Sequence, residues 1–351
     1  MSRPTIFGTF LILALVIAAR WFAGDTEVQH LSPSSTNSTD RSRVPQAAIV
    51  RLDWSADGCS LLCLFRDLGE AQVSLAVLPL VPQGRRMPAY AADQPIANAA
   101  LAPDGAHILL STTGGELLWM ETDSFAVVTL FRLPPATDFA KLAVFDNGLA
   151  AAATAHGSLC VIDPGRQTVS ELTTGSGTCL SSLQFSHDGR RLVCGSGDGS
   201  ITAWDLASRT RLQSFEGHAR SPVQATFLPD GQRVISAGLD DTVRIWKIAD
   251  GGEEWQRECG LTGVRALDVS SDGRSAAWVG HDRKVVVWDI ERRRKKFEFM
   301  TNAAFLSTVK FSPDGATLAA GGGELVIYIY DLQTGSERTT SLHDAIEPRA
   351  R

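Results

Sequence analysis

The sequence predicts an all-β protein, a seven-bladed β-propeller made of four-stranded antiparallel blades. Two landmarks repeat in one register. Asp-Gly turns occur at positions 188, 230, 272 and 314, which are 42 residues apart, and an aromatic residue follows each of them, at Trp204, Trp246, Trp288 and Tyr330. Between the landmarks, short apolar segments alternate at period two and no helical period recurs. A repeat of this length built only from strands is typical of one propeller blade.

Each unit is expected to supply four short strands. Around Asp230, the first three strands are predicted at residues 223–227, 234–237 and 243–246. A weaker fourth strand is expected after the aromatic landmark, for example Arg211–Phe215. The Asp-Gly pair belongs in the turn between the first and second strands, because Gly adopts positive φ and Asp can accept a hydrogen bond from the backbone two residues on. Further turns at Asp57-Gly58, Asp104-Gly105 and Asn147-Gly148 bring the predicted number of blades to seven.

Three segments carry a resemblance to a known family. Residues 311–315 (FSPDG), 195–205 (GSGDGSITAWD) and 216–218 (EGH) resemble the WD-repeat (tryptophan–aspartate repeat) β-propeller family. The resemblance covers about residues 47–343 and is weakest in the first three units. It implies a non-catalytic scaffold that presents propeller faces to other proteins. The last unit has its own candidate fourth strand at 338–342, expected beside 326–330, so Ala47–Trp54 should belong to the first blade.

The family resemblance also implies a buried hydrogen-bond tetrad. It links a His before the first strand, a Ser or Thr in the second strand, an Asp in the second hairpin and the Trp that ends the third strand. One unit matches all four positions, with His218, Ser236, Asp240 and Trp246. A His, an Asp and a Ser also make up a hydrolase triad, but no nucleophile elbow accompanies them, so the structural role is favoured.

Two neighbouring units match the tetrad only in part. Asp198 with Trp204, and Asp282 with Trp288, keep the spacing of the Asp and the Trp. Neither unit has the His, and Cys194 and Trp278 stand where the hydroxyl would be. These units are therefore predicted to hold partial tetrads.

One run of basic residues stands out: Arg292, Arg293, Arg294, Lys295 and Lys296. It is expected at the turn between the third and fourth strands of the sixth blade. One interpretation is a patch for an anionic partner or a lipid surface. The other, which is favoured, is a solvated rim, because acidic residues such as Asp289 and Glu291 share these turns and opposite charges cancel the field.

The composition excludes several classes of function. The 351 residues are 44% hydrophobic and 21% charged, as in a globular protein, and the net charge of −6 gives no global attraction for nucleic acid. The seven His and six Cys show no metal-ligand or haem spacing, so no cofactor and no metal are expected. A periplasmic propeller enzyme or small-ligand binder using the central channel remains the alternative. Inward-pointing acids or histidines at the channel mouth would favour it.

The N-terminal segment predicts a location outside the cytoplasm or at a membrane. Ile6–Ala19 carries no charge, which fits either a cleaved signal peptide or a single membrane anchor. A buried core helix is the less favoured alternative. The expected organisation is a leader at 1–24, a disordered Ser/Thr-rich linker at 25–46, the propeller at 47–343 and a tail at 344–351. The propeller itself is expected to be monomeric.

Overall fold

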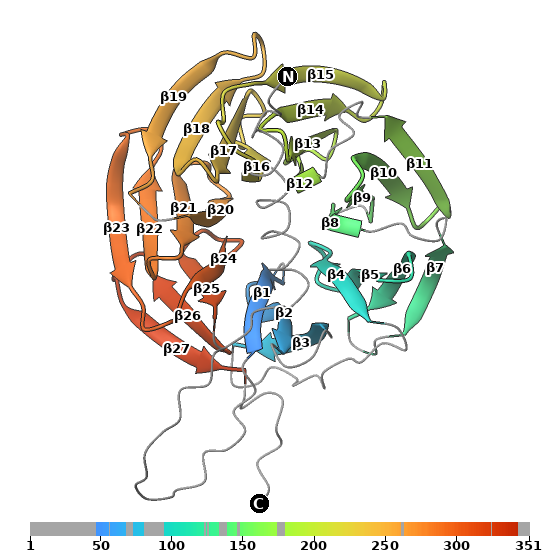
Figure 1. Ribbon diagram of the computed structural model, residues 1–351. Helices are drawn as coiled ribbons and strands as arrows, with labels where there is room; N and C mark the ends of the chain where they lie inside the picture. The colour runs from blue at the N-terminus through green and yellow to red at the C-terminus, as the bar shows by residue number, and fades with distance from the viewer. Residues whose placement is uncertain are drawn as a thin grey trace, which may run out of the picture.

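The computed structural model describes residues 47–55, 57–67, 73–80, 95–122, 124, 126–132, 139–145, 148–173, 180–260, 263–323 and 325–342. These residues form 27 strands in seven antiparallel sheets, and no helix occurs among them. The sheets stand around a common centre as the blades of a propeller (Figure 1). The predicted fold class is confirmed.

The blades follow one another along the chain, and the strands of each blade run from the centre outward. Blade 1 contains β1 (Ala47–Trp54), β2 (Ser60–Asp67) and β3 (Val73–Pro79). Blade 2 contains β4 (Ile96–Leu101), β5 (His107–Thr112), β6 (Glu116–Glu121) and β7 (Val127–Arg132). Blade 3 contains β8 (Phe139–Val144), β9 (Ala150–Thr154), β10 (Ser158–Asp163) and β11 (Thr168–Thr173). Blade 4 contains β12 (Leu180–Phe185), β13 (Arg191–Ser196), β14 (Ile201–Asp205) and β15 (Thr210–Phe215).

The last three blades have the same order of strands. Blade 5 contains β16 (Pro222–Phe227), β17 (Arg233–Gly238), β18 (Thr242–Lys247) and β19 (Glu253–Glu258). Blade 6 contains β20 (Val264–Val269), β21 (Ser275–Gly280), β22 (Lys284–Asp289) and β23 (Arg294–Met300). Blade 7 contains β24 (Leu306–Phe311), β25 (Thr317–Gly322), β26 (Val326–Asp331) and β27 (Glu337–Ser341).

The core lies between neighbouring blades rather than inside any single blade. The second and third strands are apolar on both faces and almost wholly buried, whereas the outer strands β19 and β23 are largely exposed. At the junction of blades 5 and 6, for example, Ile235 and Ile245 pack in one cluster with Trp278 and Trp288. Each blade can bury its two faces only against its neighbours, and this requirement closes the ring.

The Asp-Gly turns lie where the sequence predicts them. The six Asp-Gly pairs predicted at these turns, at 57, 104, 188, 230, 272 and 314, all connect the first and second strands of a blade, and their glycines have φ between 64° and 69°. In blade 5, the Gly231 amide donates to the Leu228 carbonyl at 2.9 Å, and the Gln232 amide donates to the Asp230 carboxylate at 2.8 Å. In blade 3, Gly148 keeps the same place with φ 81°, while residues 146–147 lie outside the described residues. The turn chemistry therefore sets the repeat.

Ring closure follows the prediction that the last blade completes itself. β27 pairs with β26, and β1 pairs with β2 of its own blade. No strand is exchanged between blades 7 and 1 among the described residues. Instead, the Trp54 indole donates to the Lys310 carbonyl at 3.1 Å, and the Ser307 hydroxyl donates to the Ile49 carbonyl. Side-chain packing and two side-chain hydrogen bonds close the ring.

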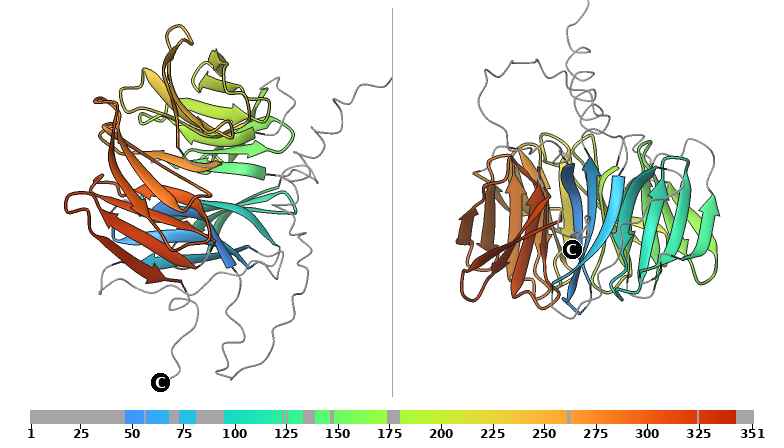
Figure 2. Two further views of the ribbon diagram at one scale, coloured as in Figure 1. Left: turned by 60° about the vertical axis from the view of Figure 1, so that its left-hand side comes forward. Right: turned by 90° about the horizontal axis from the view of Figure 1, so that it is seen from below.

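The ring has two faces, and the strands run between them (Figure 2). Because the strands of a blade are antiparallel, the turn between strands one and two and the turn between strands three and four open on the same face. We call this the Asp-Gly face. The first strand of every blade begins on the opposite face, so the chain enters blade 1 there, at Ala47.

The predicted leader, linker and tail (residues 1–24, 25–46 and 344–351) lie outside the described residues. Within the part of the chain that the structure describes, no helix is long and apolar enough to cross a membrane.

Candidate functional site: a buried polar network in blade 5

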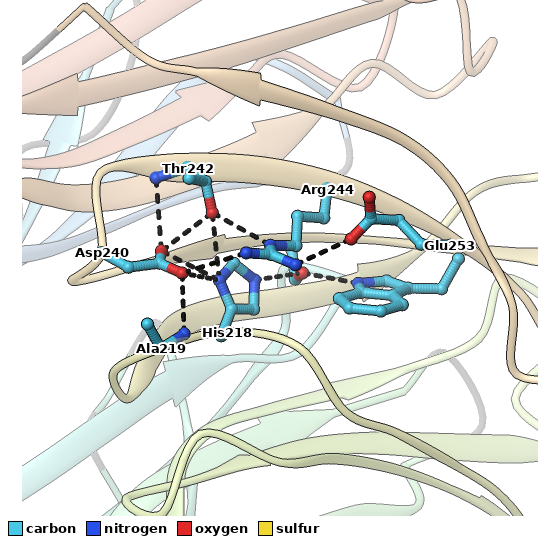
Figure 3. A network of polar contacts seen from close by, with 8 residues as sticks. His218, Ala219, Asp240, Thr242, Arg244 and Glu253 are labelled. Carbon is cyan, nitrogen blue, oxygen red and sulfur yellow. Dashed lines mark hydrogen bonds and ion pairs between the residues drawn. The ribbon is translucent and has the colours of Figure 1, made fainter.

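The four tetrad residues come from four different segments of the chain that meet inside blade 5. His218 lies in the loop between β15 and β16, and Ser236 lies in the middle of β17. Asp240 lies in the turn between β17 and β18, and Trp246 is near the end of β18. The structure brings these side chains into one network (Figure 3).

The hydrogen bonds form an unbroken chain from the indole to the carboxylate. The Trp246 indole N–H donates to the Ser236 Oγ at 2.8 Å, and the Ser236 Oγ lies 2.7 Å from the His218 Nε2. The His218 Nδ1 lies 3.0 Å from both oxygens of Asp240. Trp can only donate and a carboxylate can only accept, so we assign the serine proton to His218 Nε2 and the imidazole proton to Nδ1. With His218 neutral, the Trp246 N–H, the Ser236 O–H and the His218 Nδ1–H each donate to the next group in the chain.

The Asp240 carboxylate also has partners that the sequence did not suggest. It accepts hydrogen bonds from the Ala219 amide at 3.0 Å and from the Thr242 hydroxyl at 2.9 Å. The Arg244 guanidinium lies 3.5 Å from Asp240 and 2.7 Å from Glu253. The sequence does contain a signal for the Thr242 contact, because a hydroxyl residue follows the Asp by two positions in both blades, as Thr242 after Asp240 and as Ser200 after Asp198. Such an Asx-type turn ties the carboxylate to its own hairpin.

The electrostatics of the network keep Asp240 charged and His218 neutral. The hydrogen bonds from His218 and the Ala219 amide outweigh desolvation and hold the pKa of Asp240 below its ordinary value. Burial lowers the pKa of His218, although Asp240 opposes the shift. The ion-pair distance alone would favour an imidazolium. We favour neutral His218 because its side chain is 0% exposed and because the Ser236 hydroxyl occupies its Nε2.

A glycine makes room for this network. A Cβ built on Gly238 would lie 2.5 Å from the His218 Nδ1 and 2.6 Å from the Asp240 Oδ1. Both distances are too short for any side chain, so the end of β17 must be glycine for the His and the Asp to meet.

The geometry argues against a hydrolase triad at this place. Ser236 is 0% exposed, and its hydroxyl oxygen is bonded to both Trp246 and His218. A nucleophile must reach a substrate carbonyl, and this hydroxyl is enclosed by the blade. The network can hold the loop before β16 against the turn after β17, which is a structural role.

Blade 4 holds a partial tetrad, and its parts do not join. The Asp198 carboxylate accepts from the amide and hydroxyl of Ser200 and thus serves its own turn. The Trp204 indole nitrogen is buried without a hydrogen-bond partner among the described residues. Burial raises the pKa of the neighbouring Cys194 thiol to about 12. A thiol is a poor substitute for the hydroxyl acceptor.

Blade 6 replaces the network by aromatic packing. Trp278 and Trp288 pack with ring centroids 5.9 Å apart, and Trp255 from blade 5 packs on Trp288 at 5.8 Å. The Trp278 indole nitrogen is buried without a hydrogen-bond partner in the described part of the chain. Asp282 receives a hydrogen bond of 3.5 Å from the Lys284 amide and does not join Trp288.

The basic run is placed partly as predicted. Arg292 and Arg293 lie in the turn, but Arg294, Lys295 and Lys296 belong to β23, so the prediction that all five occupy the turn is wrong. Arg294, Lys295 and Lys296 are all exposed, and their place in the strand follows from pairing with β22, in which Asp289 lies opposite Arg294 and Trp288 opposite Lys295.

Several of these cations are matched by acids. Arg292 pairs with Asp289 at 3.0 Å, and Arg293 pairs with Glu254 at 3.4 Å. Lys295 pairs with Glu298. The Lys296 ammonium donates to the Ser275 hydroxyl at 3.5 Å. Much of the charge of the run is therefore balanced, which favours the solvated-rim interpretation.

The innermost strands carry charged residues that the sequence analysis did not single out. Arg51 pairs with Asp53 at 2.8 Å and also donates to the Leu142 carbonyl of blade 3. Lys310 of blade 7 pairs with Asp268 of blade 6 at 2.9 Å. Asp268 and Asp53 together raise the pKa of Lys310 against its burial. The contact from Arg51 to Leu142 and the pair of Lys310 with Asp268 link the inner strands of different blades.

Among the described residues, no group of three or more His, Cys, Asp or Glu is placed to hold a metal ion. The five described cysteines, Cys59, Cys63, Cys160, Cys194 and Cys259, are free, and all but Cys59 are buried.

Comparison with known proteins defines the class of this propeller. A family model described as WD domain, G-beta repeat matches residues 167–205 and 209–247. The second segment contains His218, Ser236, Asp240 and Trp246, so the complete tetrad lies inside one matched repeat. A search of curated proteins gives no match to this chain. The chain is a seven-bladed β-propeller with two segments similar to WD repeats.

Proposed function

We propose that this chain is a non-catalytic scaffold that holds other proteins on the faces of a rigid propeller, at a membrane or beyond it. The observation that carries the proposal is that the residue types best suited to catalysis are buried in a structural network. His218, Ser236 and Asp240 are enclosed in a network that fixes blade 5. Propellers similar to WD repeats are typically such scaffolds.

The alternative, an enzyme or small-ligand binder that uses the central channel, has less support. It needs acids or histidines that are free to act on a ligand. On the inner strands, Asp53 accepts from Arg51, and Asp268 accepts from Lys310 and from the Phe311 amide. Carboxylates bound in this way hold the ring together and are poor general bases.

Capture of a partner by the full chain tests the scaffold. The intact protein, solubilised in detergent, would be immobilised and exposed to detergent extracts of membranes from its native cells. We expect a protein partner that is retained in saturable, near-stoichiometric amounts. The matched control is the same chain unfolded in urea, which should retain none of it. Turnover of a small molecule by the purified chain, with no protein partner, would contradict the proposal.

Fractionation tests the proposed location separately. The leader at 1–24 carries this part of the proposal, because an uncharged segment followed by Arg20 and Trp21 suits either an anchor or a signal peptide. We expect the intact chain with the membranes or a shortened chain in the exported fraction. An intact, unshortened chain in the soluble cytoplasm would contradict both versions.

A further inference from the structure

A groove opens on the Asp-Gly face between blades 4 and 5. It has a volume of about 470 Å³, within the range of about 300–1,000 Å³ that ligand sites occupy. Arg191 lines it from blade 4, and Arg233, Lys247 and Glu254 line it from blade 5. Ile248 provides an apolar portion of its wall. The groove is thus large enough for part of an extended chain and has both charged and apolar contacts to offer.

The two carboxylates of the groove are already engaged. One oxygen of Asp230 accepts from the amides of Gln232 and Arg233, and the other accepts from the Arg233 Nε at 2.6 Å. One oxygen of Glu254 serves two arginines, Arg233 at 3.6 Å and Arg293 at 3.4 Å. Neither carboxylate is left to balance the remaining cations of the groove.

Two cations remain without an acid of their own. The Arg191 guanidinium donates to the Gly231 carbonyl at 2.7 Å, a neutral acceptor that fixes its position across the two blades. Lys247 is exposed and forms no ion pair within the described residues. Asp188 and Asp205 feel the charge of Arg191, but each accepts hydrogen bonds within its own turn instead of pairing with it. Arg191 and Lys247 therefore offer two separated positive charges on the wall of the groove that form no ion pair within the described residues.

This pattern favours an acidic peptide over the other polyanions. Nucleic acid is disfavoured because no aromatic side chain lines the groove for base stacking, and because Asp230 and Glu254 would repel a dense row of phosphates. A lipid surface is disfavoured for the same electrostatic reason, because its closely spaced anionic headgroups would also face Asp230 and Glu254.

We propose that the groove between blades 4 and 5 binds an acidic, extended segment of a partner protein. Spaced carboxylates of the segment pair with Arg191 and Lys247, and an apolar side chain between them contacts Ile248. The proposal rests on the scaffold function and names the chemistry of one partner. Such pairs set specificity and association rate, and they weaken as salt rises.

Selection from a display library of short random peptides tests the proposal on the full chain in detergent. We expect the retained peptides to be rich in Asp and Glu around an apolar residue. Their affinity should fall about tenfold in Lys247→Glu and fall as salt increases. Lys247 makes no contact that the fold needs, so this variant should remain folded. Arg191→Gln, which removes the second cation, should weaken the same peptides.

The matched control is Arg338→Glu, which reverses an exposed arginine on the outer strand of blade 7 and should leave the affinity unchanged. The proposal is overturned if Lys247→Glu binds the selected peptides as tightly as the wild type. It is also overturned if the groove variants lose binding only to phosphatidylserine vesicles or to single-stranded DNA. If the native partner binds wild type and Lys247→Glu equally well, the groove fails and the scaffold stands. If the chain binds no protein at all, the scaffold itself fails.

Discussion

Blades 5 and 6 are neighbours built on one repeat, yet they are held together by different interactions. In blade 5, a chain of hydrogen bonds runs from Trp246 through Ser236 and His218 to Asp240. In blade 6, an indole replaces the serine, and Trp278 packs against Trp288 instead. The Arg257 guanidinium of blade 5 covers the Trp288 ring at 4.1 Å. One backbone therefore accepts either polar or aromatic contacts at the same positions.

The polar network of blade 5 and the aromatic packing of blade 6 differ in how well they tolerate the loss of a hydrogen-bond partner. The polar network needs every member, because one missing partner leaves a buried donor or acceptor unpaired at about 1–3 kcal/mol. The aromatic solution tolerates the loss, since the unpaired Trp278 indole nitrogen is offset by buried ring area and favourable ring contacts. Blade 4 lies between these two, with Trp204 unpaired and only Cys194 in the serine position.

The largest effect should come from placing a serine in blade 6 at position 278, which is equivalent to Ser236 of blade 5. Trp278→Ser supplies a hydroxyl near Trp288 but removes a side chain that is 1% exposed. We expect a loss of about 3–5 kcal/mol in the free energy of unfolding, because the cavity outweighs any new hydrogen bond. Urea unfolding of the full chain in detergent measures it. A variant as stable as the wild type would mean that the two solutions are interchangeable.

The second effect compares two aspartates at the same repeat position. Asp240→Ala removes the carboxylate that binds His218, Thr242 and Arg244, and we expect a loss of about 3 kcal/mol. Asp198→Ala removes an acceptor that serves Ser196 and Ser200 of its own hairpin and should cost about 1 kcal/mol. Thermal unfolding of both variants checks the difference. Equal losses would show that Asp240 acts only within its own turn.

The fold could be predicted because its determinants are local and repeated. The Asp-Gly turns mark one position in six of the seven blades, the aromatic landmark marks another in blades 4 to 7, and period-two alternation marks the strands between them. The start of β23 is harder to predict from the sequence, because Arg294, Lys295 and Lys296 carry long polar side chains on an exposed outer strand. The sequence shows alternation only at Phe297 and Phe299, and the pairing with β22 is what extends the strand back to Arg294.

The rest of the site depended on contacts between different blades. The link from Arg51 to Leu142 joins blades 1 and 3, and the link from Lys310 to Asp268 joins neighbouring blades one repeat apart, and neither pairing follows from the sequence pattern within a blade. Likewise, the charge of the groove follows from which acids are already engaged by Arg233 and Arg293, and side-chain positions decide that. A count of charges along the chain predicts a balanced rim and cannot show that Arg191 and Lys247 form no ion pair within the described residues.

A smaller effect should follow from exchanging the hydroxyl and the thiol between blades 4 and 5. Ser236→Cys keeps the side chain small but weakens the acceptor for Trp246 and the donor for His218, and should cost about 1–2 kcal/mol. The reciprocal Cys194→Ser offers Trp204 an oxygen and should stabilise blade 4 by up to about 1 kcal/mol. Urea unfolding of the two variants gives both values. A destabilising Cys194→Ser would show that Trp204 is not oriented to use an oxygen.

The smallest effect is a pH dependence carried by His218. Burial lowers the pKa of His218 below 6.5 in the folded chain, so the unfolded chain binds the proton more readily. The stability that this group contributes is complete above pH 6.5 and decreases as the pH falls toward the folded pKa. The pKa of Asp240 is also lowered, and its contribution is lost only at lower pH, as the pH falls below 3.8 through its folded pKa. The two groups therefore act in separate windows.

Unfolding midpoints measured across the first window separate this titration from a general loss of stability. In His218→Gln the midpoint should be lower at every pH, and its slope below pH 6.5 should be shallower than in the wild type. The slope should not vanish, because burial and Arg265 also lower the pKa of His281. His187→Gln, which changes an exposed histidine, should keep the wild-type slope. If His218→Gln keeps that slope as well, the imidazole is already charged in the folded chain, and blade 5 is held by an ion pair between His218 and Asp240 rather than by a neutral chain of hydrogen bonds.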